Sequence, residues 1–207
     1  MIMKVQAHEV LNEEAALTCP RLTALERSML TWAMIERGDK VLDMTPRLGT
    51  MLGYVARHME CEICGLSSDM ENVRQVRMRL RNADILYSNT EDIPWRENSF
   101  HVVFMQGARR GSDDANWEII MRETLRVLRP GGQFVLAAVN YPTPFRQIAN
   151  LLQGDGCGTE QAGFTSKGKW LTAMHAAGYR GVTWQQTDFS RGLAIGWKPS
   201  EFGLKAM

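Results

Sequence analysis

The chain has 207 residues, of which 44% are hydrophobic and 23% are charged, which is typical of one globular domain with a full core. Its 24 Lys and Arg residues balance 23 Asp and Glu residues, so the net charge is +1 and no strong field attracts nucleic acid or an anionic membrane. Polar residues such as Lys4 and Glu9 interrupt the first 20 positions, so we expect neither a signal peptide nor a membrane span there. These features predict a cytoplasmic protein.

The four cysteines are scattered along the chain and do not indicate a disulfide framework. Cys61 and Cys64 form a CxxC pattern, but the residues around them predict a strand, on which the two side chains would point to opposite faces. Buried thiols in the core are therefore favoured over a redox or zinc role, and no metal site is predicted.

Strand and helix patterns alternate from residue 22 onward. Strand patterns occur at 40–44, 61–66, 83–89, 101–106 and 133–140. Helical patterns occur at 22–35, around 51–55, from Asp69, and at 114–128, 145–152 and 166–177. On the helix from Asp69, Val73, Val76 and Leu80 are expected to face inward, whereas Arg74, Arg77 and Arg81 are expected to form a solvated face.

Two more strand patterns, at 181–189 and 192–199, are close enough in sequence to pair as an antiparallel hairpin. The whole pattern predicts an α/β fold: a doubly wound, mostly parallel seven-stranded sheet with helices on both faces and a C-terminal antiparallel hairpin. Pro130 and Gly131 suit a type II turn before the fifth strand. Sheets of this kind bind ligands at the carboxyl ends of their strands.

No repeat or long linker suggests a domain boundary. We expect a single domain made of an N-terminal helical cap region (1–38), a cofactor-binding core (39–140) and a third part (141–207). The third part would hold substrate-side helices and the hairpin.

Four segments, in order, carry a family resemblance: VLDMTPRLGT, GLSSDMENV, NTEDIPWRENSFHVVF and RVLRPGGQFVL. Together they resemble the successive motifs of class I S-adenosylmethionine-dependent methyltransferases, in particular the small-molecule branch akin to quinone C-methyltransferases. The similarity covers residues 22–141, and its specificity lies in the order and spacing of the motifs. A Rossmann-like fold and S-adenosylmethionine as cofactor are what the resemblance implies.

The resemblance also implies which residues bind the cofactor. Asp43 matches the acidic residue that ends the first strand, and Thr45, Arg47 and Gly49 stand where the family has three glycines. Ser67, with Ser68 beside it, replaces the acidic residue that holds the ribose hydroxyls. Asn89 replaces the acidic residue that contacts adenine, and the remaining candidates are Thr90, Glu91 and Gln106.

The sequence leaves two interpretations of the loop after the first strand. Thr45 and Pro46 form a helix-start pattern, with Thr as N-cap and Pro at the first helical position, beside which Arg47 would favour an anion. Alternatively, Thr45 only caps a helix and Arg47 points to solvent. Both interpretations stay open.

Two classes of function follow from these residues. The first is a methyltransferase that acts on a small molecule; the alternative is a catalytically inactive relative that serves as a binding or regulatory module or binds an anionic ligand. An oxidoreductase is disfavoured because TPRLGT lacks the G-x-G-x-x-G pattern. A homodimer or protein partner is left open.

No catalytic residue is assigned, because the methyl donor carries the reactivity and the protein mainly supplies orientation. Contacts to the methyl acceptor are expected from 106–110, 140–145 and the loop around Cys157. Within the first segment, Arg109 and Arg110 either hold an acidic substrate or are solvated. Trp170 and His175 belong either to the core or to a pocket wall.

Overall fold

The computed structural model describes residues 22–106, 116–139, 166–188 and 191–200. The described strands are β1 (Lys40–Asp43), β2 (Glu62–Ser67), β3 (Asp84–Tyr87), β4 (Phe100–Gln106), β5 (Leu128–Val139), β6 (Arg180–Gln186) and β7 (Arg191–Trp197). The described helices are α2 (Ala24–Trp32), α3 (Thr50–Met59), α4 (Met70–Arg79), α5 (Trp117–Val127) and α7 (Lys167–Ala177). The helix predicted at 145–152 lies outside the described residues.

All seven strands form one sheet in the order β3-β2-β1-β4-β5-β7-β6. The first five strands along the chain pair in parallel, and β7 runs antiparallel between β5 and β6. The predicted doubly wound sheet with a C-terminal antiparallel hairpin is therefore confirmed. Gly131 has the positive φ (79°) that the predicted turn requires, although β5 continues through it because its N–H donates to the Lys198 carbonyl.

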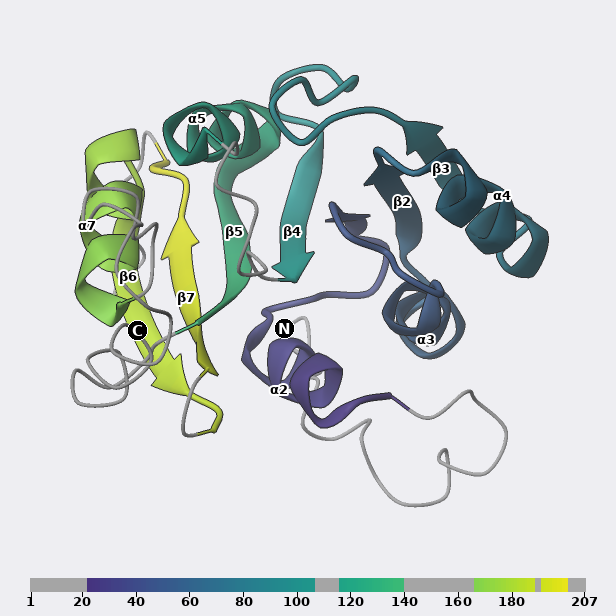
Figure 1. Cartoon of the computed structure of the whole chain (residues 1–207), viewed down its shortest axis with the longest axis horizontal. Coiled ribbons are helices and arrows are strands. Elements are labelled where there is room, and N and C mark those ends of the chain that lie inside the picture. Colours follow the sequence, from purple (N-terminus) through teal and green to yellow (C-terminus); the bar gives the residue numbers. More distant parts are fainter. Residues whose placement is uncertain (1–21, 107–115, 140–165, 189–190, 201–207) are drawn as a thin grey trace, which may run out of the picture.

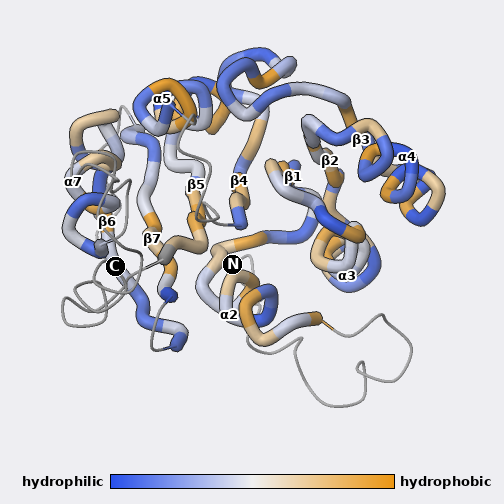
Figure 2. Tube along the Cα trace, viewed as in Figure 1, coloured by the Kyte–Doolittle hydropathy of each residue, from blue (hydrophilic) through white to orange (hydrophobic). Residues whose placement is uncertain are grey.

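The sheet separates two hydrophobic cores, one on each face, and Figure 1 shows the helices that cover it. Helices α2, α3 and α4 pack on one face, and α5 and α7 pack on the other. In Figure 2 the central strands carry most of the apolar tube, whereas much of α4 and of the edge strand β6 is hydrophilic. The core thus follows the sheet and leaves its two strand-end edges available for binding sites.

Helix α2 begins with a capping box and ends earlier than the sequence predicts. The Thr23 hydroxyl accepts from the Glu26 N–H, and the Glu26 carboxylate accepts from the Thr23 N–H. Beyond Trp32 the buried Gln133 side chain bonds to the backbone in place of further helical hydrogen bonds. It donates to the Trp32 carbonyl (3.1 Å) and accepts from the Met34 N–H (2.8 Å). A polar residue of β5 therefore ends the helix three residues before Ile35.

Helix α4 has the predicted inward stripe and the predicted exposed arginine face. Val73 and Val76 are buried and Leu80 packs against the same core. The Arg77 guanidinium donates two hydrogen bonds to the Ile85 carbonyl (2.8 and 2.5 Å) and so links α4 to the edge strand β3. Arg77 is therefore exposed, as expected, and in addition bonds to the backbone of β3.

Cys61 and Cys64 are both free, buried and packed into opposite cores, as the strand pattern predicts. Burial raises the pKa of the Cys61 thiol to about 11 and that of Cys64 to about 12, so both stay protonated near neutral pH. Among the described residues no group of three or more His, Cys, Asp or Glu side chains could hold a metal ion. No helix in the described ranges is both long and apolar enough to cross a membrane.

Candidate active site

The candidate site lies along the carboxyl edge of the parallel strands. The strand order reverses between β1 and β4, because β2 and β3 continue on one side of β1 and β5 lies on the far side of β4. In open α/β sheets the ligand crevice lies at this switch point, outside the carboxyl ends of the strands. Asp43, Ser67 and Gln106 end β1, β2 and β4, so the fold brings these candidate residues to one edge.

Asp43 organises the loop that follows β1 from a buried position. Its side chain is 1% exposed, and its Oδ1 accepts from the Thr45 backbone N–H at 2.9 Å. Burial raises the pKa of this carboxyl to about 7, and the nearby charge of Glu26 adds to the increase, while the bond from Thr45 opposes it. Asp43 therefore holds the loop by accepting from the backbone N–H of Thr45.

Thr45 is not the N-cap of a helix, so that prediction is wrong. Helix α3 begins at Thr50, and its N-cap is Gly49, which has a left-handed backbone and no side-chain cap. A turn closed by the Gly49 N–H and the Pro46 carbonyl (2.5 Å) separates Thr45 from the helix. The Thr45 hydroxyl instead accepts from the Gln106 N–H (2.7 Å) and thereby joins the ends of β1 and β4 across the switch point.

The turn after Thr45 keeps the left-handed geometry of a glycine loop although one glycine position holds arginine. Arg47 has a φ of 42°, a conformation that costs a non-glycine residue about 1–2 kcal/mol. Its side chain is exposed, as one of the two sequence interpretations expects. Gly49 has a φ of 72°, and a Cβ there would lie 3.0 Å from a methyl group of Leu80, so only glycine fits.

Two side chains of α4 hold this turn, and no sequence pattern points to either. The Asn72 amide donates to the Arg47 carbonyl, and the Arg79 guanidinium donates to the Leu48 carbonyl at 3.2 Å. These contacts join residues 25 and 31 positions apart, so only the folded chain reveals them. They satisfy two backbone carbonyls of the turn and fasten it to α4.

At the end of β2, serines stand where the resemblance places a ribose-binding acid. The Ser67 side chain is half-buried, and its Oγ accepts from the Asp69 N–H at 3.1 Å, which leaves the hydroxyl proton as a donor. Ser68 is exposed. Asp69 caps α4 by accepting from the Glu71 N–H, so its carboxylate is already used for the helix start.

After β3, Asn89, Thr90 and Glu91 form a compact turn. The Asn89 Oδ1 accepts from the Glu91 N–H at 2.7 Å, and the Asn89 carbonyl accepts from the Asp92 N–H. An amide oxygen has two lone pairs, so Asn89 keeps one for another donor and also keeps its NH₂ group. Glu91 accepts from the Asn116 N–H (2.8 Å) and so ties this loop to the start of α5. Thr90 is half-buried between them.

Most residues predicted to contact a methyl acceptor lie outside the described residues, including Arg109, Arg110, 140–145 and the loop around Cys157. The two remaining candidates on α7 are resolved differently. Trp170 is fully buried and packs edge-to-face on Trp117, with ring centroids 4.7 Å apart, so it belongs to the core. His175 is exposed.

This combination of fold and site defines a class of protein. The strand order with one inserted antiparallel strand, the acidic end of β1 and the glycine turn into α3 are those of the class I S-adenosylmethionine-dependent methyltransferase fold. Comparison with known proteins agrees. Residues 42–136, a little under half of the chain, match the family described as "Methyltransferase domain", and the chain is similar to class I methyltransferases, among them the quinone C-methyltransferases.

The similar proteins share sequence over part of their length. The chain is 28% identical over 133 residues to a sarcosine/dimethylglycine N-methyltransferase of Halorhodospira halochloris, covering 61% of this chain and 45% of that protein. It is 24% identical over 143 residues to a ubiquinone/menaquinone biosynthesis C-methyltransferase of Idiomarina loihiensis, covering 65% and 55%. The chain thus spans about half the length of these two relatives.

A solved structure extends the likeness in fold to almost the whole chain. The structure of an S-adenosylmethionine-dependent methyltransferase from Aquifex aeolicus superposes with a TM-score of 0.64 at 14% identity, and it covers 96% of this chain and 100% of the other. At this identity the likeness concerns the fold.

Proposed function

We propose that the protein is a methyltransferase that uses S-adenosylmethionine to methylate a small molecule. The observation that carries this proposal is the meeting of Asp43, Ser67 and Gln106 at one sheet edge, beside the switch point, within a matched methyltransferase domain. When bound, S-adenosylmethionine supplies an activated methyl group on a sulfonium. The protein then has to bind, orient and shield the two reactants.

The residues at this edge offer hydrogen-bonding groups suited to such a cofactor, although neutral side chains stand where the family usually has acidic ones. The Ser67 hydroxyl and the Asn89 amide would take the ribose and adenine ends through neutral hydrogen bonds. The positive charge of Arg47 and the N-terminus of α3 would suit the cofactor's carboxylate. Asp43 would hold the loop between them through the Thr45 N–H.

The neutral ribose contact predicts a cofactor affinity below that of a site with a carboxylate. A hydrogen bond to a charged group contributes about 1.5–3 kcal/mol, and each ~1.4 kcal/mol changes the affinity tenfold. If a site with the carboxylate binds at about a micromolar, a loss of this size gives a dissociation constant of roughly ten to a few hundred micromolar. Ser67→Asp should lower it by about tenfold, because it restores a charged acceptor at the end of β2.

Calorimetric titration with S-adenosylmethionine and S-adenosylhomocysteine tests the proposal. We expect binding that is lost in Asp43→Ala and kept in Asp84→Asn, which alters a carboxylate at the opposite end of the sheet. Thermal unfolding of each variant separates lost binding from lost folding. Absence of binding up to millimolar ligand in the folded wild type and in Ser67→Asp would contradict the proposal and favour the inactive binding module.

The acceptor, the oligomeric state and any protein partner belong to the same proposal. A small molecule is favoured because the similar sequences act on sarcosine, dimethylglycine or quinone precursors by name. A homodimer or a protein partner stays a prediction, as does the cytoplasmic location.

A further inference from the structure

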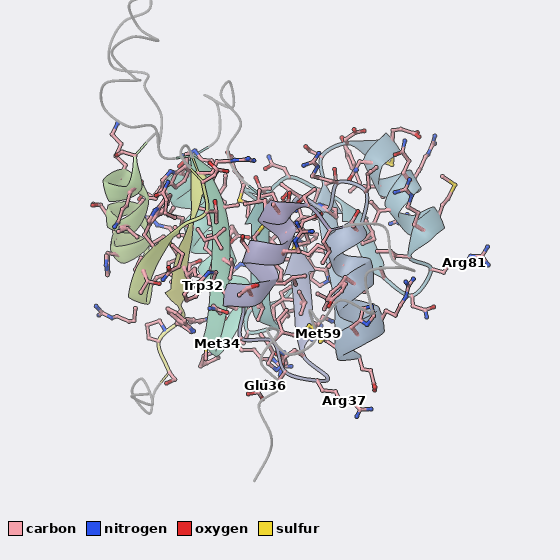
Figure 3. The ribbon with its side chains drawn as sticks, turned by 90° about the horizontal axis from the view of Figure 1, so that it is seen from below. Trp32, Met34, Glu36, Arg37, Met59 and Arg81 are labelled. Atoms are coloured by element: carbon pink, nitrogen blue, oxygen red, sulfur yellow. The ribbon has the colours of Figure 1, made fainter. Side chains whose placement is uncertain are left out.

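A cavity of about 400 Å³ opens at the amino edge of the sheet, opposite the candidate cofactor site. Its wall includes Asp39 before β1, His101 near the start of β4, and Arg129 in the first residues of β5. Met34 and Glu36 contribute from the segment between α2 and β1, which Figure 3 labels, and Trp197 contributes from the end of β7.

The proton positions on His101 follow from a backbone contact. The Lys40 N–H points at Nδ1 of His101, with 2.9 Å between the nitrogens. A backbone amide can only donate, so Nδ1 must accept, and the neutral ring carries its proton on Nε2. The Nε2–H therefore faces into the cavity wall beside Arg129.

Arg129 brings a second donor to the same point. Its Nη1 lies 2.8 Å from Nε2 of His101, and a guanidinium has donors only. The two groups cannot hydrogen-bond to each other, because each presents an N–H. An acceptor atom placed beside the pair, within hydrogen-bond reach of both nitrogens, would satisfy both donors and neutralise the arginine charge, and an anionic oxygen does this best.

The surroundings restrict the charge and shape of that anion. Asp39 is nearly buried; its Oδ2 accepts from the Glu36 N–H (2.7 Å), and its Oδ1 lies 3.6 Å from Nδ1 of His101. With Glu36 it places negative charge close to the donors, which disfavours a doubly charged phosphate. Met34 and the half-buried Trp197 supply an apolar wall for the rest of the ligand.

We propose that this cavity is a second ligand site, separate from the cofactor crevice, that binds a small monocarboxylic acid with an aromatic or apolar body. The carboxylate is held by Arg129 and the Nε2–H of His101, and the body lies against Trp197 and Met34. The site does not depend on methyl transfer, because its residues lie at the opposite edge of the sheet from Asp43 and Gln106.

NMR titration of the ¹⁵N-labelled protein with benzoate tests the site. We expect saturable shifts of the Trp197 indole N–H and of the Gly131 and Gly132 amides, which line the same cavity. Long-range ¹H–¹⁵N spectra of the histidines should show His101 protonated on Nε2. Arg129→Gln should weaken benzoate binding at least tenfold, because it removes the charged donor.

The controls separate this site from general effects. Arg122→Gln alters another exposed arginine, one paired with Glu118 on α5, and should leave benzoate binding unchanged. Benzyl alcohol, which has the same ring without the charge, should cause little shift. Equal shifts with benzyl alcohol, a proton on Nδ1 of His101, no saturation up to tens of millimolar, or equal weakening by Arg122→Gln would each overturn the proposal. Addition of S-adenosylhomocysteine should not displace benzoate, whether or not the protein binds it.

Discussion

At the scale of single residues, Asp43 combines a conventional position with an unusual environment. Its carboxyl ends β1, as the acidic residue of the family does, but it is buried and accepts from a backbone N–H of its own loop. Burial shifts its pKa from 3.8 to about 7. The sequence predicted the position, but the protonation depends on burial and on the nearby charge of Glu26, which no local pattern contains.

The raised pKa predicts a pH-dependent stability. The unfolded carboxyl loses its proton near pH 4, whereas the folded one keeps it to about pH 7, so folding binds a proton between these values. The stabilising contribution of Asp43 is fully present below about pH 4 and is lost as the pH rises through about 7. Relative to Asp43→Asn, the wild type should lose about 2–4 kcal/mol of unfolding free energy between pH 4 and pH 8.

Urea denaturation at several pH values measures this difference. Asp84→Asn is the matched control, because it alters an exposed carboxylate on β3. A difference between wild type and Asp43→Asn that does not change with pH would show that Asp43 is ionised in the folded protein.

Thr45 provides the second prediction at this scale. Its hydroxyl accepts from the Gln106 N–H, so Thr45→Val leaves a half-buried donor without its partner while keeping the side-chain shape. We expect a loss of about 1–2 kcal/mol in unfolding free energy. Thr45→Ser keeps the hydroxyl and should lose less than half as much. If both variants lost the same amount, the hydroxyl would not be the stabilising group.

At the scale of elements, most strands and helices were predictable because their apolar periodicity matches the two-sided core. The ends were not. Helix α2 stops at Trp32 because Gln133, about a hundred residues later, pairs with its backbone. Helix α3 starts at Thr50, because a turn lies between Thr45 and the helix. The threonine and proline pattern did not reveal this turn. The first error comes from hydrogen bonds between elements, and the second from a turn closed within the loop itself.

Glycine substitutions test the start of α3. Gly49→Ala forces a Cβ into a left-handed position 3.0–3.1 Å from Leu80 and Val76, and should destabilise the protein by about 1–3 kcal/mol. Gly168→Ala places the same Cβ in open space on α7 and should stabilise by up to about 1 kcal/mol. Thermal unfolding of the two variants should therefore shift in opposite directions. Destabilisation by both variants would mean that the left-handed backbone and the close Cβ contact at Gly49 are not the reason why glycine is needed there.

At the scale of the whole molecule, the alternating pattern was enough to predict the sheet, and the antiparallel hairpin followed from two strands close in sequence. The candidate site was predictable only as positions along one edge. What these positions do depends on cross-edge contacts, such as Thr45 with Gln106 and Asn72 with Arg47, that join different strands and helices. The cavity beside His101 and Arg129 was not predicted, because its residues carry no family motif.

A ligand bound at one edge of the sheet should stabilise the entire fold. The two cores share one sheet, so they should unfold together, and a ligand that binds only the folded protein should raise the melting temperature measured by circular dichroism and by tryptophan fluorescence equally. At a hundred times its dissociation constant, S-adenosylhomocysteine adds about 2.7 kcal/mol, which corresponds to about 5–10 °C here. Asp43→Ala should abolish the shift, whereas Arg129→Gln should leave it intact, because Arg129 lies at the opposite edge of the sheet. A shift seen by one probe only would mean that the two faces of the sheet unfold separately, and an equal loss in both variants would mean that the ligand does not act at the carboxyl edge.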